Sequence, residues 1–237
     1  MVLEYALFLF ILVTAVTLSV VKNKLTVAGA LAGSLIACLI FWGAGFTGIA
    51  MLGLFFILGS AATSWKIHTK ETLHAAEENK GKRKINQVIA NGGVAAITGL
   101  LSSVIAAQQP LLQLMMAAAL SSATADTLSS ELGTLYGKKF FNILTLKKDT
   151  RGENGVVSIE GVLFGITGST LIASVYAMGF GWNKYFFYII IAGTIGNLAD
   201  SILGATLERK HRIPNDAVNI LNTLIAALIA WALAGIF

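Results

Sequence analysis

The stretch LLQLMMAAALSSATADTLSSELG, residues 111–133, begins like a membrane-spanning segment but ends among polar residues. Its length suits one crossing, because a helix needs about 17–25 mainly apolar residues to span a bilayer. Its second half nevertheless contains Asp126 and Glu131. An ionised carboxylate deep in a bilayer costs about 2.5–3.5 kcal/mol or more, so it has to pair, bind an ion or face a water-filled cavity. The stretch therefore predicts a membrane helix with a functional site near one end; a structural hydrogen bond between helices is the alternative.

The composition places the whole chain in a membrane. Hydrophobic residues make up 56% of the 237 residues and charged residues only 12%, and the mean hydropathy is +0.76. A soluble domain carries about 25% charged residues. The single cysteine, Cys38, excludes an internal disulfide framework. No basic segment precedes the first apolar run, which favours a retained first span over a cleaved signal peptide.

Eight segments are apolar and long enough to cross a membrane. They cover residues 3–21, 25–42, 46–65, 87–107, 111–133, 159–180, 185–207 and 217–236. We expect an all-α, polytopic integral membrane protein with about eight transmembrane helices, in which residues 1–237 form a single transmembrane domain.

The basic residues fall almost entirely on one side of these spans. Sixteen of the seventeen Lys and Arg residues lie in segments 22–24, 66–86, 134–158 and 208–216, and only Lys184 lies on the other side. The positive-inside rule then places these segments in the cytoplasm and the N- and C-termini outside. If the source is prokaryotic, the membrane is the plasma (inner) membrane. We expect the loops at about 66–86, 134–158 and 208–216 to form the active-site face.

Polar residues of four predicted helices share one depth. Asp126 and Asp200 each lie seven residues before the cytoplasmic end of their helix, which is about 10 Å below that surface. Asn91, Asn219 and Asn222 lie at a similar level near the starts of two further spans. This layer, beside the basic loops, is the candidate site.

Two basic loops and a glycine-rich segment adjoin that layer. Lys82, Arg83 and Lys84 lie in one loop and Lys147, Lys148 and Arg151 in another. As a group they suit a polyphosphate, although membrane topology and anionic headgroups explain any single Lys equally well. In RGENGVVSIEG, residues 151–161, glycines and a helix N-terminus would bring backbone amides to an anion; an ordinary loop capped by Ser158 is the alternative. The sequence contains no G-x-x-x-x-G-K-[ST] pattern, which excludes a P-loop.

Five motifs, taken in order, resemble one known family. They are QVIANGG (87–93), ADTLSSELG (125–133), NGVVS (154–158), ADSILGATLE (199–208) and NDAVN (215–219). Together they resemble an integral-membrane family that includes the plant phytyl-phosphate kinase of tocopherol synthesis. That family is more distantly similar to phytol kinase, dolichol kinase and phosphatidate cytidylyltransferase.

The resemblance implies a transfer of phosphate from CTP, or another nucleoside triphosphate, to an isoprenoid monophosphate. Asp126 and Asp200 would then be catalytic and would hold Mg²⁺. The predicted substrate- and nucleotide-binding residues are Asn91, Glu131, Lys82, Arg83, Lys84, Lys147, Lys148, Arg151, Asn154, Gly155, Ser158, Gly204, Glu208, Asn215 and Asn219. The sequence departs from the family pattern at Val156, Glu208 and Asp216, where Gly, Gln and Asn are usual.

The expected partners are a nucleoside triphosphate, with CTP favoured, a lipid isoprenoid monophosphate and membrane lipids, with no nucleic acid. The oligomeric state stays open. Two other functions share these residues. An ion-coupled transporter or flippase would use the acids as a proton or Na⁺ relay, and a cytidylyltransferase would make a CDP-lipid with the same ligands.

Overall fold

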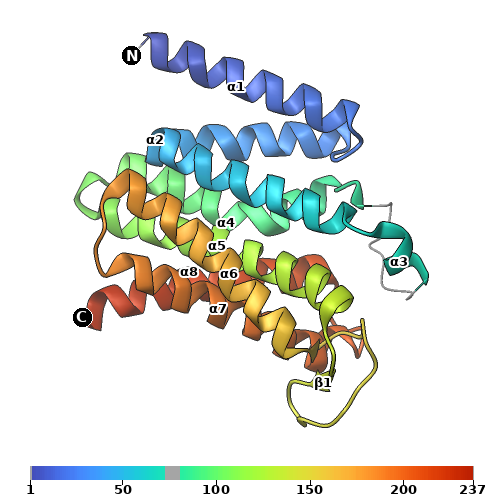
Figure 1. Cartoon of the computed structure of the whole chain (residues 1–237). Coiled ribbons are helices and arrows are strands. Elements are labelled where there is room, and N and C mark those ends of the chain that lie inside the picture. The colour runs from blue at the N-terminus through green and yellow to red at the C-terminus, as the bar shows by residue number, and fades with distance from the viewer. Residues whose placement is uncertain (1, 73–80, 237) are drawn as a thin grey trace.

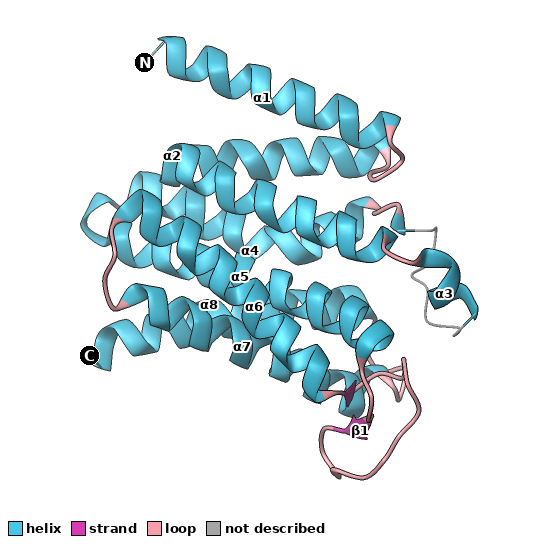
Figure 2. Ribbon diagram, viewed as in Figure 1, coloured by secondary structure: helices cyan, strands magenta, loops and turns pink. Residues whose placement is uncertain are grey.

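Long apolar helices account for most of the chain (Figures 1 and 2). The computed structural model describes residues 2–72 and 81–236. Its elements are α1 (Val2–Val21), α2 (Val27–Ser64), α3 (Ile67–Thr72), α4 (Ile85–Val104), η2 (Ala106–Gln108), α5 (Gln109–Tyr136), β1 (Phe141–Asn142), β2 (Val156–Val157), α6 (Ile159–Phe180), α7 (Tyr185–Leu203), η3 (Gly204–Glu208) and α8 (Asn215–Ile236). Among the described residues, seven helices are long and apolar enough to cross a membrane.

One of these seven, α2, crosses twice. A straight helix of its 38 residues would be about 57 Å long, nearly twice the hydrocarbon core of about 30 Å. The helix breaks at Gly45, whose φ of +56° is open to glycine but disfavoured for other residues, and the chain then runs back (Figure 1). The two legs are tight against each other, since a Cβ at Gly48 would lie 2.6 Å from Ile40. The expected all-α fold with about eight spans is confirmed.

α5 forms the centre of the bundle. It packs against α2, α4, α6, α7 and α8. In the 18-residue stretch that marks this span, 83% of the residues are buried, against 11% in the corresponding stretch of α1. Small residues allow this close packing. A Cβ added at Gly133 of α5 would lie only 2.7 Å from the Cα of Gly161 in α6. The helix that carries Asp126 and Glu131 is therefore held on nearly every side by protein.

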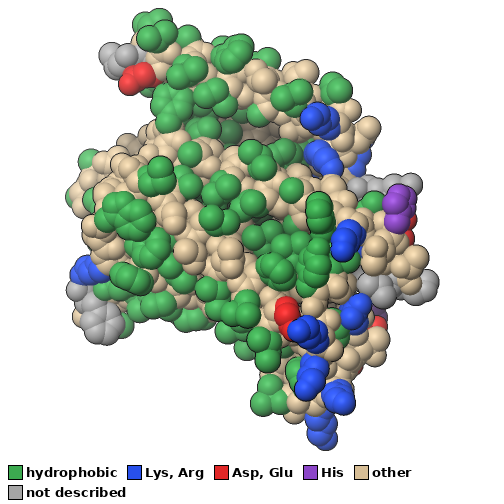
Figure 3. Space-filling model, in the orientation of Figure 1, with side chains coloured by type: hydrophobic (Ala, Val, Ile, Leu, Met, Phe, Trp, Pro, Cys, Tyr) green, Lys and Arg blue, Asp and Glu red, His purple; other side chains and the backbone are tan. Residues whose placement is uncertain are grey.

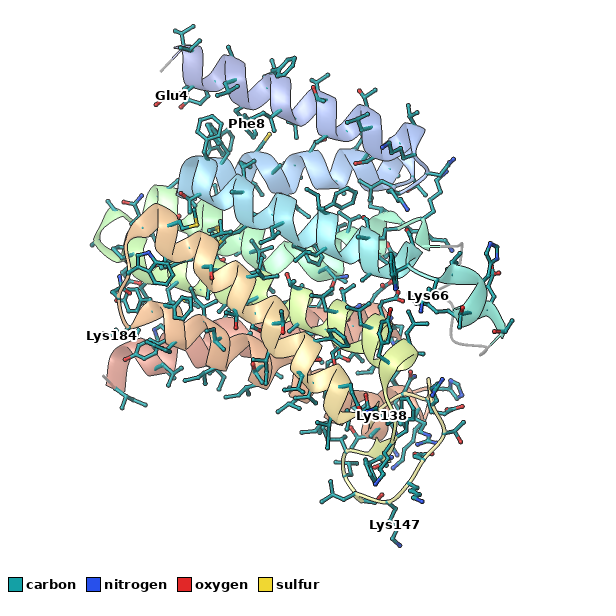
Figure 4. All side chains as sticks on the ribbon, in the orientation of Figure 1. Glu4, Phe8, Lys66, Lys138, Lys147 and Lys184 are labelled. Atoms are coloured by element: carbon teal, nitrogen blue, oxygen red, sulfur yellow. The ribbon has the colours of Figure 1, made fainter. Side chains whose placement is uncertain are left out.

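The two ends of the bundle differ in charge. Both termini lie at one end (Figure 1), and Lys184 lies there as well (Figure 4). Lys66, Lys138 and Lys147 lie at the opposite end (Figure 4), where Lys and Arg side chains gather (Figure 3). We call this opposite end the basic end. The charge asymmetry expected from the sequence is thus present in the fold, while the side of the membrane that the basic end faces stays a prediction.

Candidate functional site

A polar cavity of about 270 Å³ lies at the basic end, among the ends of α4, α5, α6, α7 and α8. Serine, asparagine, glycine and acidic residues dominate its lining. The predicted site residues that line it are Arg83, Asn91, Asp126, Glu131, Asn154, Gly155, Ser158, Asp200, Gly204, Glu208, Asn215 and Asn219. Segments far apart in the sequence therefore meet around one space, as expected from their common depth.

The two predicted catalytic acids adjoin in this cavity. Asp126 of α5 and Asp200 of α7 are within hydrogen-bonding reach of each other. Asn222 of α8 donates from Nδ2 to Oδ2 of Asp200 at 2.6 Å. The amide oxygen of Asn222 in turn accepts from the hydroxyl of Ser122 at 3.2 Å. This chain of contacts fixes the Asp200 carboxyl toward Asp126, so three helices set the distance between the acids.

The end of α7 is irregular next to the acids. Residues 204–208 form a π-helical turn, in which the amide of Arg209 donates to the carbonyl of Gly204 at 2.9 Å. Such turns are rare and often occur at functional sites. Glu208 emerges from this turn, lines the cavity and lies within reach of the side chain of Asn154. The π-turn therefore brings Glu208 to the glycine-rich segment.

The glycine-rich segment closes the cavity from the basic end. Gly155 has a φ of +78°, and a Cβ there would lie 2.3 Å from Ala205, so only glycine fits. Next to it, β2 pairs antiparallel with β1, with Val156 opposite Asn142. The amide of Val156 donates to the carbonyl of Glu153 at 3.1 Å. That amide is therefore used within the turn, at the position where the family pattern has glycine.

Asp149 and Arg209 hold this segment onto the end of α7. The guanidinium of Arg209 donates to both carboxylate oxygens of Asp149, at 2.6 and 3.2 Å. The backbone amide of Thr150 donates to the same carboxylate at 2.8 Å. Arg209 first, and then Thr150, keep the pKa of Asp149 well below its usual range. The geometry is the bidentate pair in which Arg binds carboxylates most strongly.

Ser158 joins the segment to α6, where it both caps the helix and lines the cavity. Its hydroxyl accepts from the amide of Gly161 at 3.1 Å and so caps the helix N-terminus. The same residue lines the cavity. The capping alternative is therefore correct, and it does not remove Ser158 from the site.

Glu131 is buried rather than solvated at its helix end. Only 6% of its side chain is exposed, and it forms an ion pair with Lys70 of α3. Lys70 is itself buried and also donates to the carbonyls of Ala62 and Thr63, at 2.7 and 3.2 Å. Oε1 of Glu131 is buried and has no hydrogen-bond partner within residues 2–72 and 81–236. One oxygen thus anchors α3, while the other has no hydrogen-bond partner in the described part of the chain.

Arg83 is a buried cation at the start of α4. A short parallel bridge pairs it with Leu25, through hydrogen bonds of 3.0 and 3.1 Å to Lys24 and Thr26. Its guanidinium lies over the ring of Phe55, 5.2 Å from the centroid. A Cβ at Gly59 would lie 2.6 Å from that guanidinium, so glycine makes room for it. Backbone pairing and this niche together direct Arg83 into the bundle.

Comparison with known proteins identifies the family of the chain. Residues 10–227 match the family model described as integral membrane protein DUF92. The chain belongs to this family. The resemblance expected from the motifs is confirmed, and every one of the five motifs falls within the matched residues.

Several relatives of the chain are similar over most of its length. Protein VTE6, chloroplastic, of Arabidopsis thaliana is 32% identical over 213 residues, which cover 87% of this chain and 64% of VTE6. An uncharacterised membrane protein of Methanocaldococcus jannaschii is 30% identical over 94% of this chain and 92% of its own length. An uncharacterised membrane protein of Synechocystis is 34% identical over 200 residues, which cover 81% of this chain and 76% of that protein. No solved structure matches the chain.

Five predicted basic residues lie outside the cavity lining of this family member. Arg151 donates to the carbonyl of Gly137 at 3.3 Å and stacks over Phe140. Lys82 donates to Asn23 at 3.1 Å, at some remove from the acids. Lys84, Lys147 and Lys148 are exposed. Among the six predicted basic residues, Arg83 alone lines the cavity.

Other residues of the site were not selected from the sequence. Asn197 of α7 is buried, lines the cavity and lies against Gly165 of α6. Asn222 was placed in the polar layer but was assigned no catalytic or binding role, although it holds Asp200. The signal for both was an amide inside an apolar span, where an unpaired polar group is costly. Lys70 carried no such signal, because it lies in a loop rich in basic residues.

The acids fit a magnesium ion. No three His, Cys, Asp or Glu side chains gather into a metal cluster in the described part of the chain. Mg²⁺ needs no such cluster, because it is usually held by one or two carboxylates together with phosphates and waters. The adjoining carboxyls of Asp126 and Asp200 match that requirement.

Proposed function

We propose that the chain is a kinase that converts an isoprenoid monophosphate to the diphosphate at the cytoplasmic membrane face, with a nucleoside triphosphate, CTP favoured, as donor. The observation that carries this proposal is the pair of adjoining acids, Asp126 and Asp200, in a polar cavity closed by a glycine-rich segment. Membership of the family and the similarity to VTE6 support a prenyl-phosphate kinase.

The chemistry requires little covalent participation from the protein. An oxygen of the acceptor monophosphate attacks the γ-phosphorus of the nucleotide. The bond between that phosphorus and the β–γ bridging oxygen breaks, and the nucleoside diphosphate leaves with the electron pair. The acceptor oxygen is already ionised near neutral pH, so no strong general base is needed. Positioning and charge stabilisation then supply most of the rate acceleration.

The lining residues divide between these two tasks. Asp126 and Asp200 would hold Mg²⁺, which neutralises charge on the phosphate oxygens. The backbone around Gly155 and the amide side chains of Asn154 and Asn215 line the side of the cavity that faces the basic end, and we assign the nucleotide to that side. Lys147, Lys148 and Arg151, on the loop between α5 and α6, would attract it electrostatically.

The position of the cavity argues against transport. Transporter sites lie near the bilayer midplane, where both faces have access. This cavity lies at one end of the bundle, next to the extramembrane segment 143–155. A cytidylyltransferase would use the same ligands but would direct the lipid phosphate to the α-phosphorus of CTP, which releases diphosphate.

The products of purified protein distinguish the three functions. The protein in nanodiscs would be incubated with Mg²⁺, each of CTP, ATP, GTP and UTP, and phytyl, geranylgeranyl or farnesyl monophosphate. The proposal predicts a prenyl diphosphate and a nucleoside diphosphate in equal amounts. A CDP-lipid together with released diphosphate would instead show that the protein is a cytidylyltransferase. If no combination of nucleotide and prenyl monophosphate gave a product, and the protein carried ions across the membrane of proteoliposomes, the transporter would be the correct function.

A further inference from the structure

A second, apolar cavity of about 610 Å³ lies between α1, α2 and α4. Aliphatic and aromatic side chains from α1 and α2, such as Leu12, Ile36 and Phe56, form its walls. Its volume falls within the range of about 300–1,000 Å³ that is usual for small-molecule sites. We call this space the apolar groove.

The outer wall of the groove is a helix attached at its two ends. Near the termini, Phe8 of α1 stacks on Phe41 of α2, with centroids 4.1 Å apart. Near the basic end, Leu25 pairs with Arg83. Between these anchors α1 packs mainly against α2, and the surface beneath α1 is hollowed (Figure 3). The groove is therefore open toward lipid along the side of the bundle.

The apolar groove and the polar cavity share two residues, Arg83 and Asn91, which belong to both linings. The only other polar side chain in the described lining of the groove is Ser19, whose hydroxyl is already bonded to the carbonyl of Ala15 at 2.6 Å. A cation and an amide thus stand where an apolar channel meets the acids. This arrangement matches an amphiphile with an anionic head and a single hydrocarbon tail.

We propose that the apolar groove holds the hydrocarbon chain of the lipid monophosphate, with its phosphate at Arg83 and Asn91. This proposal rests on the function proposed above and deepens it by locating the acceptor. The phosphate would then face Asp126 and Thr127, which line the polar cavity beside Arg83, while the nucleotide approaches from the basic end. The two substrates meet at the acids without crossing paths.

Gly53 offers a direct test. It lines the groove, and a Cβ added there meets no heavy atom within 4 Å. Gly53→Phe therefore adds volume to the groove from a position where the first atom of the new side chain meets no protein. The matched control is Gly235→Phe near the end of α8, where an added Cβ also meets nothing within 4 Å. We expect Gly53→Phe to raise KM for geranylgeranyl monophosphate about tenfold or more, while KM for the nucleotide and turnover of dimethylallyl monophosphate stay unchanged.

A binding assay separates failure of the groove from failure of the kinase. A geranylgeranyl monophosphate with a diazirine at its tail end would be photo-crosslinked to the protein without nucleotide, and the labelled peptides mapped. The proposal predicts labels on α1 and α2 that Gly53→Phe, and also Gly33→Leu in the same groove, strongly reduce. Labels elsewhere, labels unchanged in both variants, or labels displaced by a two-chain phospholipid but not by unlabelled prenyl monophosphate would overturn it. If no substrate is phosphorylated but these labels appear, the groove stands and the kinase does not.

Discussion

The carboxyl groups of Asp126 on α5 and Asp200 on α7 adjoin inside the bundle, and Asn222 on α8 fixes one of them. Two carboxylates this close repel each other when both are ionised. The arrangement is therefore stable only with a shared proton or a cation between them. The Mg²⁺ of the proposed active site would supply that cation.

The first prediction concerns these acids. Asp126→Asn and Asp200→Asn should each lower kcat by about a hundredfold or more, because a lost metal ligand removes several kcal/mol of charge stabilisation. Asn preserves the shape, so membrane insertion and elution as a folded species should not change. Turnover at a range of Mg²⁺ concentrations is the measurement.

The matched control for the acids is Asp216→Asn. This acid lies at the start of α8, at the same end of the bundle, but does not line the cavity. The kcat of this variant should stay within about twofold of that of the original protein, because substitutions away from the site usually have small effects. Near-normal turnover of Asp126→Asn and Asp200→Asn at limiting Mg²⁺ would instead favour a structural hydrogen bond between helices.

The fold followed largely from hydropathy and glycine. Runs such as 46–65 and 185–207 match helices of the bundle, because backbone groups in lipid must be satisfied within helices. One predicted span ended at 42 and the next began at 46, with Gly-Ala-Gly between them, and Gly45 forms the break. The sequence could not show that α1 would stand apart from the bundle, because its apolar residues are compatible with contact to lipid or to protein.

The second prediction concerns topology. Since all described basic residues except Lys184 lie at the basic end or on the segments leading to it, a reporter inserted after Leu146 should be cytoplasmic and one after the C-terminus outside. Leu146 is 75% exposed, so an insertion there is tolerated more readily. An insertion at residue 76, expected to be cytoplasmic as well, lies outside the described residues. Both reporters on one side would contradict the three crossings, by α6, α7 and α8, that separate the two insertion points.

The site was predictable only in part, because depth and residue type locate an acid but not its partner. Asp126 and Asp200 were identified as charges in apolar spans. The pairing of Glu131 with Lys70 was not, since 61 positions separate them and α3 is a short helix of six residues. The role of Arg83 depends on the space that Gly59 leaves. Such complementarity arises from tertiary packing, which no local pattern encodes.

The third prediction concerns Asp149 and Arg209. Asp149→Asn should increase hydrogen exchange in residues 143–155 several-fold, because the bidentate pair that holds this segment is lost. Glu153→Gln is the control, since Glu153 is half exposed and its carboxylate comes no closer than 3.9 Å to the guanidinium of Arg209. A depressed pKa of Asp149 in the fold means that the stabilisation is present above the unfolded pKa of about 3.9 and declines as the pH falls toward the folded value. Protection, corrected for intrinsic exchange, should therefore be constant from about pH 5 to 8. A steady loss across that range would point to another titrating group.

The fourth prediction concerns the buried pair of Lys70 and Glu131. Lys70→Met should lower the free energy of unfolding in detergent by about 3–5 kcal/mol, because it leaves Glu131 buried without its cation. The carbonyls of Ala62 and Thr63 lose the same donor. Lys66→Met, four residues earlier, is the matched control, since Lys66 is exposed and its contact with the ring of Tyr136 contributes at most about 1 kcal/mol.

The double variant Lys70→Met/Glu131→Leu separates loss of the ion pair from loss of packing. If the cost of Lys70→Met comes from an uncompensated carboxylate, removing that carboxylate should recover most of the stability, because apolar replacements of a buried pair are often neutral or stabilising. Chemical denaturation of the four proteins completes a double-mutant cycle. Additive losses would show that Lys70 acts through its bonds to α2 alone. Recovery of stability without recovery of phosphate transfer is the expected result, because Glu131 also lines the cavity of the proposed active site.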